Sequence, residues 1–110
     1  MQGINTVVLV GRLGRQPELR FIDNKTAVLS FPMATSETTF ENGYKEQMTQ
    51  WHNVVMWKAL AQSASKMLKK GSLIFLEGRL HHRSYIDGQG INKEITEVIA
   101  LYYTPLDQNG

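Results

Sequence analysis

Short apolar runs separated by glycine, proline and polar turns divide the first part of the chain. Residues 5–13 contain a β-branched run that is too short for a comfortable helix, and we expect a strand there. Residues 18–22 alternate polar and apolar side chains up to a turn signal at 23–25. This alternation predicts that a hairpin begins at 18.

Apolar side chains recur on one face of the next segment, residues 26–36. Every second residue from Ala27 to Met33 is apolar, which is typical of a half-buried strand. Pro32 interrupts this pattern because it cannot donate a hydrogen bond to a neighbouring strand. It predicts an edge position, a bulge or an unpaired amide at that point.

The middle of the chain combines a polar stretch with one helical pattern. Residues 38–48 are polar around Asn42-Gly43 and predict a long hairpin loop, and residues 51–57 predict a strand. Apolar side chains then recur at helical spacing over 58–70, which ends in two lysines before Gly71. We expect a helix there, with Gly71 as its C-terminal cap.

Two further strands are expected over 73–85 and 93–103, on either side of a glycine-rich turn. A single helix between the third and fourth of five antiparallel strands is the connectivity typical of an OB-fold. We therefore predict an all-β fold with one helix: an OB-fold, a five-stranded antiparallel Greek-key barrel with a helix between strands 3 and 4. It forms one domain over 1–105, and residues 106–110 form a short polar end.

Composition narrows the function classes only modestly. The 110 residues include no cysteine, which excludes disulfides and thiolate metal sites. No signal-peptide pattern and no apolar run long enough to span a membrane occurs, so we expect neither secretion nor membrane spanning. The net charge of +2 is weakly basic, so any nucleic-acid site depends on where the charges lie.

Four blocks in the sequence resemble the bacterial single-stranded DNA-binding protein family, in order and at similar spacing. They are Asn5-x-Val7-x-Leu9-Val10-Gly11-Arg12-Leu13-Gly14 with Pro17-Glu18-Leu19-Arg20, then Ala34-Thr35-Ser36-Glu37, then Trp51-His52-x-Val54-Val55, and finally Lys70-Gly71-Ser72 with Glu77-Gly78-Arg79-Leu80. Together they cover nearly the whole chain.

This resemblance implies a cytoplasmic, nucleoid-associated homotetramer of OB domains. Such a protein binds single-stranded DNA without sequence preference and protects it during replication, repair and recombination. Family members typically continue into a flexible linker with an acidic tip that recruits other enzymes, whereas this sequence stops at Asp107-Gln108-Asn109-Gly110. Recruitment of replication and repair enzymes by that route is therefore left open.

A sequence-tolerant binder of single strands needs exposed aromatic side chains interleaved with cations. The resemblance places base-stacking residues at Trp51, Trp57 and Tyr85, with Phe40 as a further candidate in a loop of different length. Tyr44 is a candidate from its place in the same loop. The alternative is that Trp51, Trp57 and Tyr85 are ordinary core residues, and the two tryptophans do share one strand face at period two.

Basic residues in or beside the matched blocks are the candidate phosphate contacts. They are Arg12, Arg20, Lys70, Arg79 and Arg83, with Lys45 in the loop and Lys58 at the start of the helix. Any one of them is equally explained as a solvated surface charge. As a set they predict that affinity falls with salt.

The three histidines predict no metal site. The resemblance implies that His52 lies near a subunit contact, although a hydrogen-bonded strand histidine is an equal alternative. His81 and His82 are adjacent on a strand, so they point to opposite faces and do not chelate one ion together. We expect neither a metal nor a cofactor.

Two functions compete with non-catalytic DNA binding. One is an interaction module that binds partner proteins first and DNA weakly, as in primosome-type OB proteins. The other is a small OB-fold nuclease, since OB-folds do host nucleases. The acidic residues show no spacing typical of a metal-bound nuclease, and no nucleophile elbow, P-loop or dinucleotide motif occurs, so we expect no enzyme.

Overall fold

Strands make up most of the chain. The computed structural model describes residues 2–107. Its elements are β1 (Val7–Leu13), β2 (Glu18–Ile22), β3 (Thr26–Glu41), β4 (Tyr44–Trp57), α1 (Lys58–Met67), β5 (Leu73–Ile86) and β6 (Asn92–Pro105). The strands expected over 5–13, 18–22, 73–85 and 93–103 are confirmed as β1, β2, β5 and β6, and their boundaries lie within two residues of the prediction.

The strands close into a barrel because β1 pairs on both of its edges. The sheet order is β1-β5-β6-β4-β3-β2, and β1 also pairs with β3 at Arg12↔Ala34 and Leu13↔Met33. We call this contact the β1–β3 seam. The pairings are antiparallel except for β4 with β6, which run parallel at Val54↔Val98. Antiparallel pairing throughout, as expected from the sequence, is therefore wrong at this one contact.

Six strand segments form five barrel strands. β1 and β2 both pair with β3 and are separated only by residues 14–17, so they are two parts of one strand. Counted in this way, α1 lies between strands 3 and 4. The OB-fold prediction is confirmed.

The core lies inside the barrel and under α1. All four alternating apolar residues from Ala27 to Met33 are buried, and they pack with side chains of β1, β4, β5, β6 and α1. Burial at period two is what a strand with one interior face requires. The expectation for this segment is confirmed.

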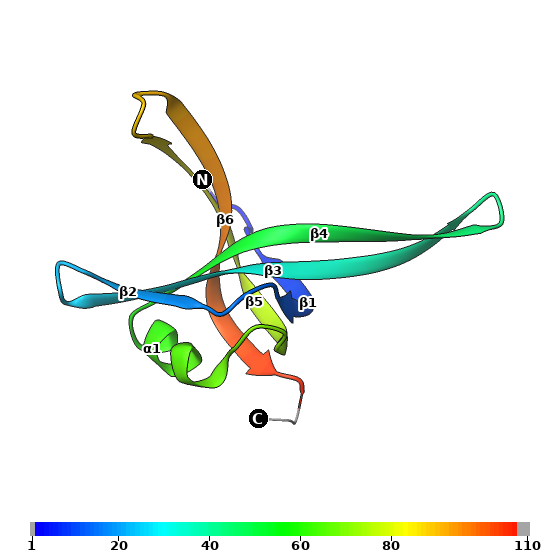
Figure 1. Ribbon diagram of the computed structural model, residues 1–110, viewed down its shortest axis with the longest axis horizontal. Coiled ribbons are helices and arrows are strands. Elements are labelled where there is room, and N and C mark those ends of the chain that lie inside the picture. The colour runs from blue at the N-terminus through cyan, green and yellow to red at the C-terminus, as the bar shows by residue number, and fades with distance from the viewer. Residues whose placement is uncertain (1, 108–110) are drawn as a thin grey trace.

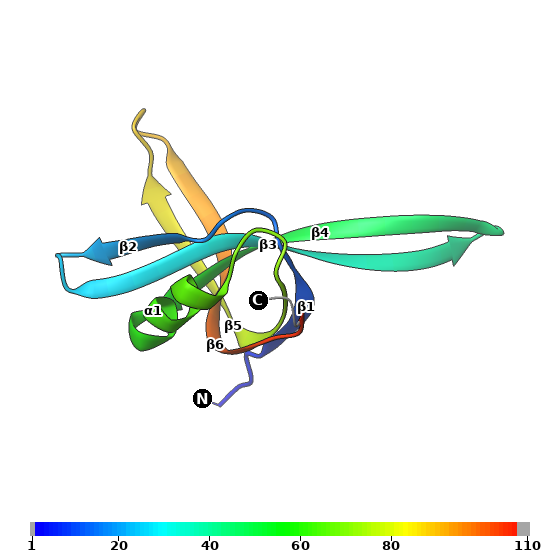
Figure 2. The same cartoon turned by 60° about the horizontal axis from the view of Figure 1, so that its bottom comes forward.

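Three hairpin arms project from the barrel (Figure 1, Figure 2). The β3–β4 arm is the longest, and the β2–β3 and β5–β6 arms leave the other side of the molecule. The radius of gyration is 16.0 Å, against about 13 Å for a compact chain of this length. The arms therefore add surface without adding core.

The predicted loop over residues 38–48 is wrong, because both strands continue through it. β3 extends to Glu41 and β4 starts at Tyr44, which leaves a two-residue turn. Asn42 and Gly43 have φ values of 54° and 82°, as a tight hairpin turn of the mirror-image type requires. The segment has no apolar alternation because neither face of this ribbon is buried.

Pro32 lies where its missing N–H matters least. Its carbonyl accepts a hydrogen bond from the N–H of Gly14 at 2.9 Å. In a strand the N–H and C=O of one residue face the same edge. Pro32 therefore faces the break between β1 and β2, which matches the expectation of an unpaired amide.

The helix is shorter than predicted. It ends at Met67, Leu68 is extended, and Gly71 lies in a turn with φ 88° instead of capping the helix. The N–H of Gly71 donates to the carbonyl of Leu13 at 2.9 Å, so pairing with β1 draws the chain out of the helix. No helix in the described part of the chain is long and apolar enough to cross a membrane.

Candidate nucleic-acid interface

A groove with a volume of about 560 Å³ crosses the outside of the barrel. It lies between the β2–β3 and β5–β6 arms, and residues of β3 and β4 line it as well. Its charged, histidine and tryptophan lining residues are Arg15, Arg20, Trp57, His81, Arg83 and Glu97. Three arginines against one glutamate give the lining of the groove a net positive charge.

The register of β3 with β4 extends one face of the groove onto the long arm. Trp57 and Asn53 line the groove, and Trp51 follows them at period two on the same face of β4. Lys45 continues the series, and its cross-strand partner is Phe40. Two tryptophans, one phenylalanine and one lysine therefore share a continuous ribbon face.

The acidic residues of the arm lie on its other face. Glu37, Glu41 and Glu46 pair with Met48, Tyr44 and Thr39, and these pairs alternate with the Phe40 and Lys45 pair. This separation leaves the ribbon face of Trp51 without a carboxylate along the arm. It also places Tyr44 on the face opposite Phe40, so one strand bound along one face does not stack on both.

Trp51 is an exposed platform supported by a glycine. Trp51 is 62% exposed, and a Cβ atom added at Gly14 would lie 2.5 Å from Cζ3 of the indole. Gly14 therefore leaves the space that the ring occupies. The alternative that Trp51 and Trp57 are core residues is wrong, since Trp57 is also 39% exposed.

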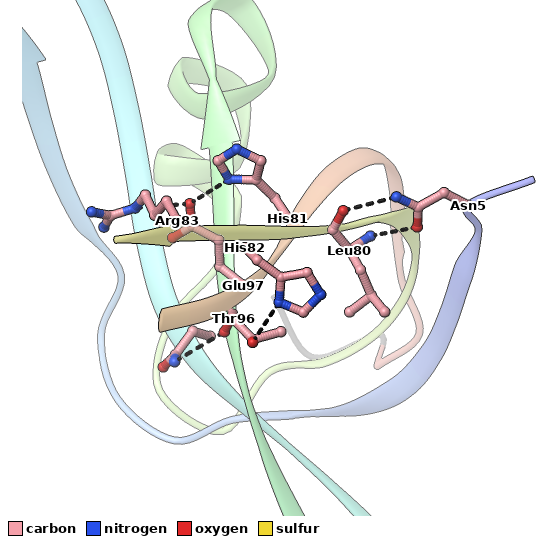
Figure 3. Close-up of polar contacts among 8 residues, drawn as sticks. Asn5, Leu80, His81, His82, Arg83, Thr96 and Glu97 are labelled. Atoms are coloured by element: carbon pink, nitrogen blue, oxygen red, sulfur yellow. Dashed lines mark hydrogen bonds and ion pairs between the residues drawn. The ribbon is translucent and has the colours of Figure 1, made fainter. Parts of the chain in front are cut away.

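Tyr85 lies beside the groove without lining it, on the face of β5 that carries the groove residues His81 and Arg83. His81, Arg83 and Tyr85 are every second residue of β5, so they share one of its faces. The guanidinium carbon of Arg83 lies 5.7 Å from the ring centroid of Tyr85. Nε of Arg83 donates to Oε1 of buried Glu97 at 3.1 Å (Figure 3). Arg83 is thus held in place by both a carboxylate and an aromatic face.

Comparison with known families and proteins gives a consistent result. The model of the single-strand binding protein family matches residues 4–105. The chain belongs to this family. Single-stranded DNA-binding proteins of two Neisseria meningitidis strains, of serogroups A and B, are each 45% identical to it over 98 residues, which is 88% of this chain. The chain spans 56% of the length of these curated relatives.

Solved structures of family members share the fold. A Plasmodium falciparum SSB in complex with ssDNA superposes with a TM-score of 0.87 at 26% identity, covering 97% of this chain and 98% of that one. A deletion mutant of the single-stranded DNA binding protein from Thermus aquaticus superposes with a TM-score of 0.84 at 30% identity, covering 98% of this chain and 53% of that one.

Several of the predicted phosphate contacts lie outside the groove. Nη1 of Arg12 donates to the carbonyl of Gly71 at 2.9 Å and lies 3.6 Å from the carboxylate of Asp107, at the end of the barrel. Lys70 lies in the nearby connection after α1, and Lys58 begins α1 with a left-handed φ of 60°. Arg79 shares the β5 face of His81 but does not line the groove.

His52 lies on the ribbon face opposite the two tryptophans. Its Nε2 is 2.9 Å from Oγ1 of Thr35, and it is half-buried. Thr35 borders Gly11, next to the β1–β3 seam. His52 is therefore hydrogen-bonded within its own sheet, as one of the two alternatives expected, and it lies near β1.

Sequence reasoning missed Arg15, Asn53 and the pair of His81 with Glu97. Asn53 carried a usable signal, because it lies at period two between Trp51 and Trp57. Glu97 carried none, since its position opposite His81 depends on how β5 pairs with β6. Within residues 2–107, no group of three or more His, Asp or Glu side chains is placed to hold a metal ion.

Proposed function

We propose that this chain is a non-catalytic domain that binds single-stranded DNA without sequence preference. The observation that carries the proposal is the single continuous face on which Trp57 and Trp51 follow an arginine-lined groove. Family membership and the relatives' names support it. By the same reasoning, its work belongs to DNA replication, repair and recombination, in the cytoplasm at the nucleoid.

Two kinds of contact account for binding of this type. Bases stack on exposed aromatic rings, each contributing about 1–3 kcal/mol, and every base offers a flat face, so the contact tolerates any sequence. Arginines of the groove pair with phosphates and release condensed counterions. Duplex DNA keeps its bases stacked inside and offers only the second kind of contact.

A titration with labelled oligo-dT and a matched duplex, at two salt concentrations, tests this function. We expect oligo-dT to quench the tryptophan fluorescence and bind far more tightly than the duplex. Its affinity should fall by about 0.7 log units per phosphate contact for each log unit of salt. Equal affinity for the two DNAs, or no binding to either, contradicts the proposal.

The two faces of the β3–β4 arm provide a matched pair of variants. Thr38 lies on the face of Trp51 and Phe40, while the adjacent Thr39 lies on the acidic face, and both are exposed. We expect Thr38→Glu to weaken oligo-dT binding at low salt by about fivefold, a Coulomb energy of about 1 kcal/mol. Thr39→Glu, with the same charge change, should bind within about twofold of the unchanged chain. Equal effects of both variants would show that DNA does not follow this face.

We also propose that the chain forms a homotetramer, on the basis of two separate surfaces. β1 uses one edge for β5 along its length but pairs with β3 only at the seam, so its other edge is open over Val7–Gly11, near His52. The outer sheet face exposes Val8, Val10 and Tyr102. Two different isologous contacts generate a tetramer, and light scattering at micromolar concentration distinguishes it from a dimer or monomer.

A further inference from the structure

One carboxylate in the groove holds two basic side chains. Oε1 of Glu97 accepts from Nε of Arg83 and lies 3.1 Å from Nδ1 of His81 (Figure 3). The side chain of Glu97 is only 7% exposed, whereas that of His81 is 39% exposed. Glu97 thus fixes one edge of the imidazole and leaves the other edge accessible.

The contact with Glu97 determines which imidazole nitrogen a ligand meets. The carboxylate, as the ion-pair partner of Arg83, only accepts hydrogen bonds, so Nδ1 of His81 carries the proton that it donates. Within residues 2–107, Nε2 of His81 has no hydrogen-bond partner. In neutral His81 this atom is therefore a lone-pair acceptor, which repels a phosphate oxygen. In protonated His81 it becomes a charged donor.

The charged groups around His81 are mostly positive, and they include Arg79, which lies next to it on the same face of β5 but outside the groove. Glu97 on β6, Arg83 on β5, Arg20 on β2 and Arg15 in the β1–β2 connection line the groove with it, and neither β3 nor β4 adds a charged group. Three arginines against one glutamate leave a net charge of +2, which protonation of His81 raises to +3. A bound phosphate backbone favours that additional charge.

We propose that binding of single-stranded DNA by this chain is coupled to protonation of His81, whose Nε2 becomes a phosphate donor in the groove. Glu97 acts as the positioning residue, because its carboxylate contacts both the imidazole and Arg83 and so orients them. The proposal rests on the proposed function. An imidazole ordinarily changes its charge between about pH 5 and pH 8, whereas carboxylates and guanidinium groups do not.

The test is the affinity for oligo-dT, whose bases keep their charge in this range, measured by fluorescence anisotropy at low salt between about pH 8 and about pH 5.5. The unchanged chain should bind about three- to tenfold more tightly at the lower pH. At the lower pH, the slope of log affinity against log salt concentration should become steeper by about 0.7, which corresponds to one additional phosphate contact.

Two substitutions at His81 separate charge from structure. His81→Gln should remove the pH dependence and stay at the weak limit, and His81→Arg should remove it and stay at the tight limit. His82→Gln is the matched control, because His82 lies on the opposite face of β5 and contacts Thr96 (Figure 3). It should keep the pH dependence of the unchanged chain.

The outcomes separate this proposal from the proposed function. Absence of oligo-dT binding at every pH would contradict the function itself. If the unchanged chain and both His81 variants all bind oligo-dT tightly and show the same pH dependence, His81 has no role in that dependence. The proposed function would then stand. Loss of the pH dependence in His82→Gln would also overturn the role of His81.

Discussion

Replacing Trp51 and Trp57 together by alanine should weaken oligo-dT binding by between about thirtyfold and about twenty-thousandfold. Each ring is expected to stack on one base, and two stacked bases contribute about 2–6 kcal/mol. Both rings are partly exposed, so their removal takes little packing from the core. Anisotropy of a labelled oligo-dT measures the loss, since the intrinsic tryptophan signal is absent from this variant.

Phe21→Ala is the matched control for the tryptophan variant. Phe21 is half exposed, but it lies on the face of β2 opposite to Arg20 and Ile22, which line the groove. Its removal should change the affinity by less than about threefold, below the range of one stacked base. The double tryptophan variant should also keep the salt dependence of the unchanged chain, because no cation is removed. Affinity within threefold of the unchanged chain would show that bases do not stack on these rings.

Gly11→Ala should destabilise the fold by about 3 kcal/mol or more, a large part of the 5–15 kcal/mol typical of a small domain. A Cβ atom at Gly11 would lie 2.0 Å from the carbonyl oxygen of Ala34. That oxygen belongs to the backbone of the β1–β3 seam itself, so relief of the clash requires the barrel to open there. Urea unfolding followed by tryptophan fluorescence measures the free energy of unfolding.

Gly3→Ala is the control for the seam, since nothing lies within 4 Å of a Cβ atom at that position. Its effect should stay within about 0.5 kcal/mol. Both proteins are compared at one chain concentration, because association stabilises the folded state. A loss below about 1 kcal/mol for Gly11→Ala would show that β1 and β3 separate without cost.

Alternation along β3 and the spacing of Trp51 and Trp57 were readable from the sequence for the same reason. Side chains of a strand alternate between faces with a period of two, so residues on one face are identified without knowledge of any partner strand. The buried row from Ala27 to Met33 and the exposed tryptophan row both follow this rule. The order of strands and helix predicted the closed barrel that connects them, and the family blocks supported it.

Two errors came from segments whose conformation is decided by distant partners. Residues 38–48 lack an apolar face, and only cross-strand pairing with an Asn-Gly turn makes them strands. The helix stops early because Gly71 and Ser72 hydrogen-bond to Leu13, which lies more than fifty residues away in the chain. Neither partner is visible in a local pattern.

The composition of the groove was decided in the same way. Arg12 and Arg15 are three residues apart, yet Arg12 is held by Gly71 and Asp107 while Arg15 lines the groove. The opposition of His81 and Glu97 requires the register of β5 with β6, which includes an irregularity between Glu77 and Gly78.

The sequence by itself determined the strand faces, the single helix and the aromatic row, because steric periodicity acts between neighbouring residues. Only the tertiary structure decided which charges meet in the groove. Barrel closure and strand register bring together side chains from β2, β5 and β6, and these depend on the packing of the whole chain.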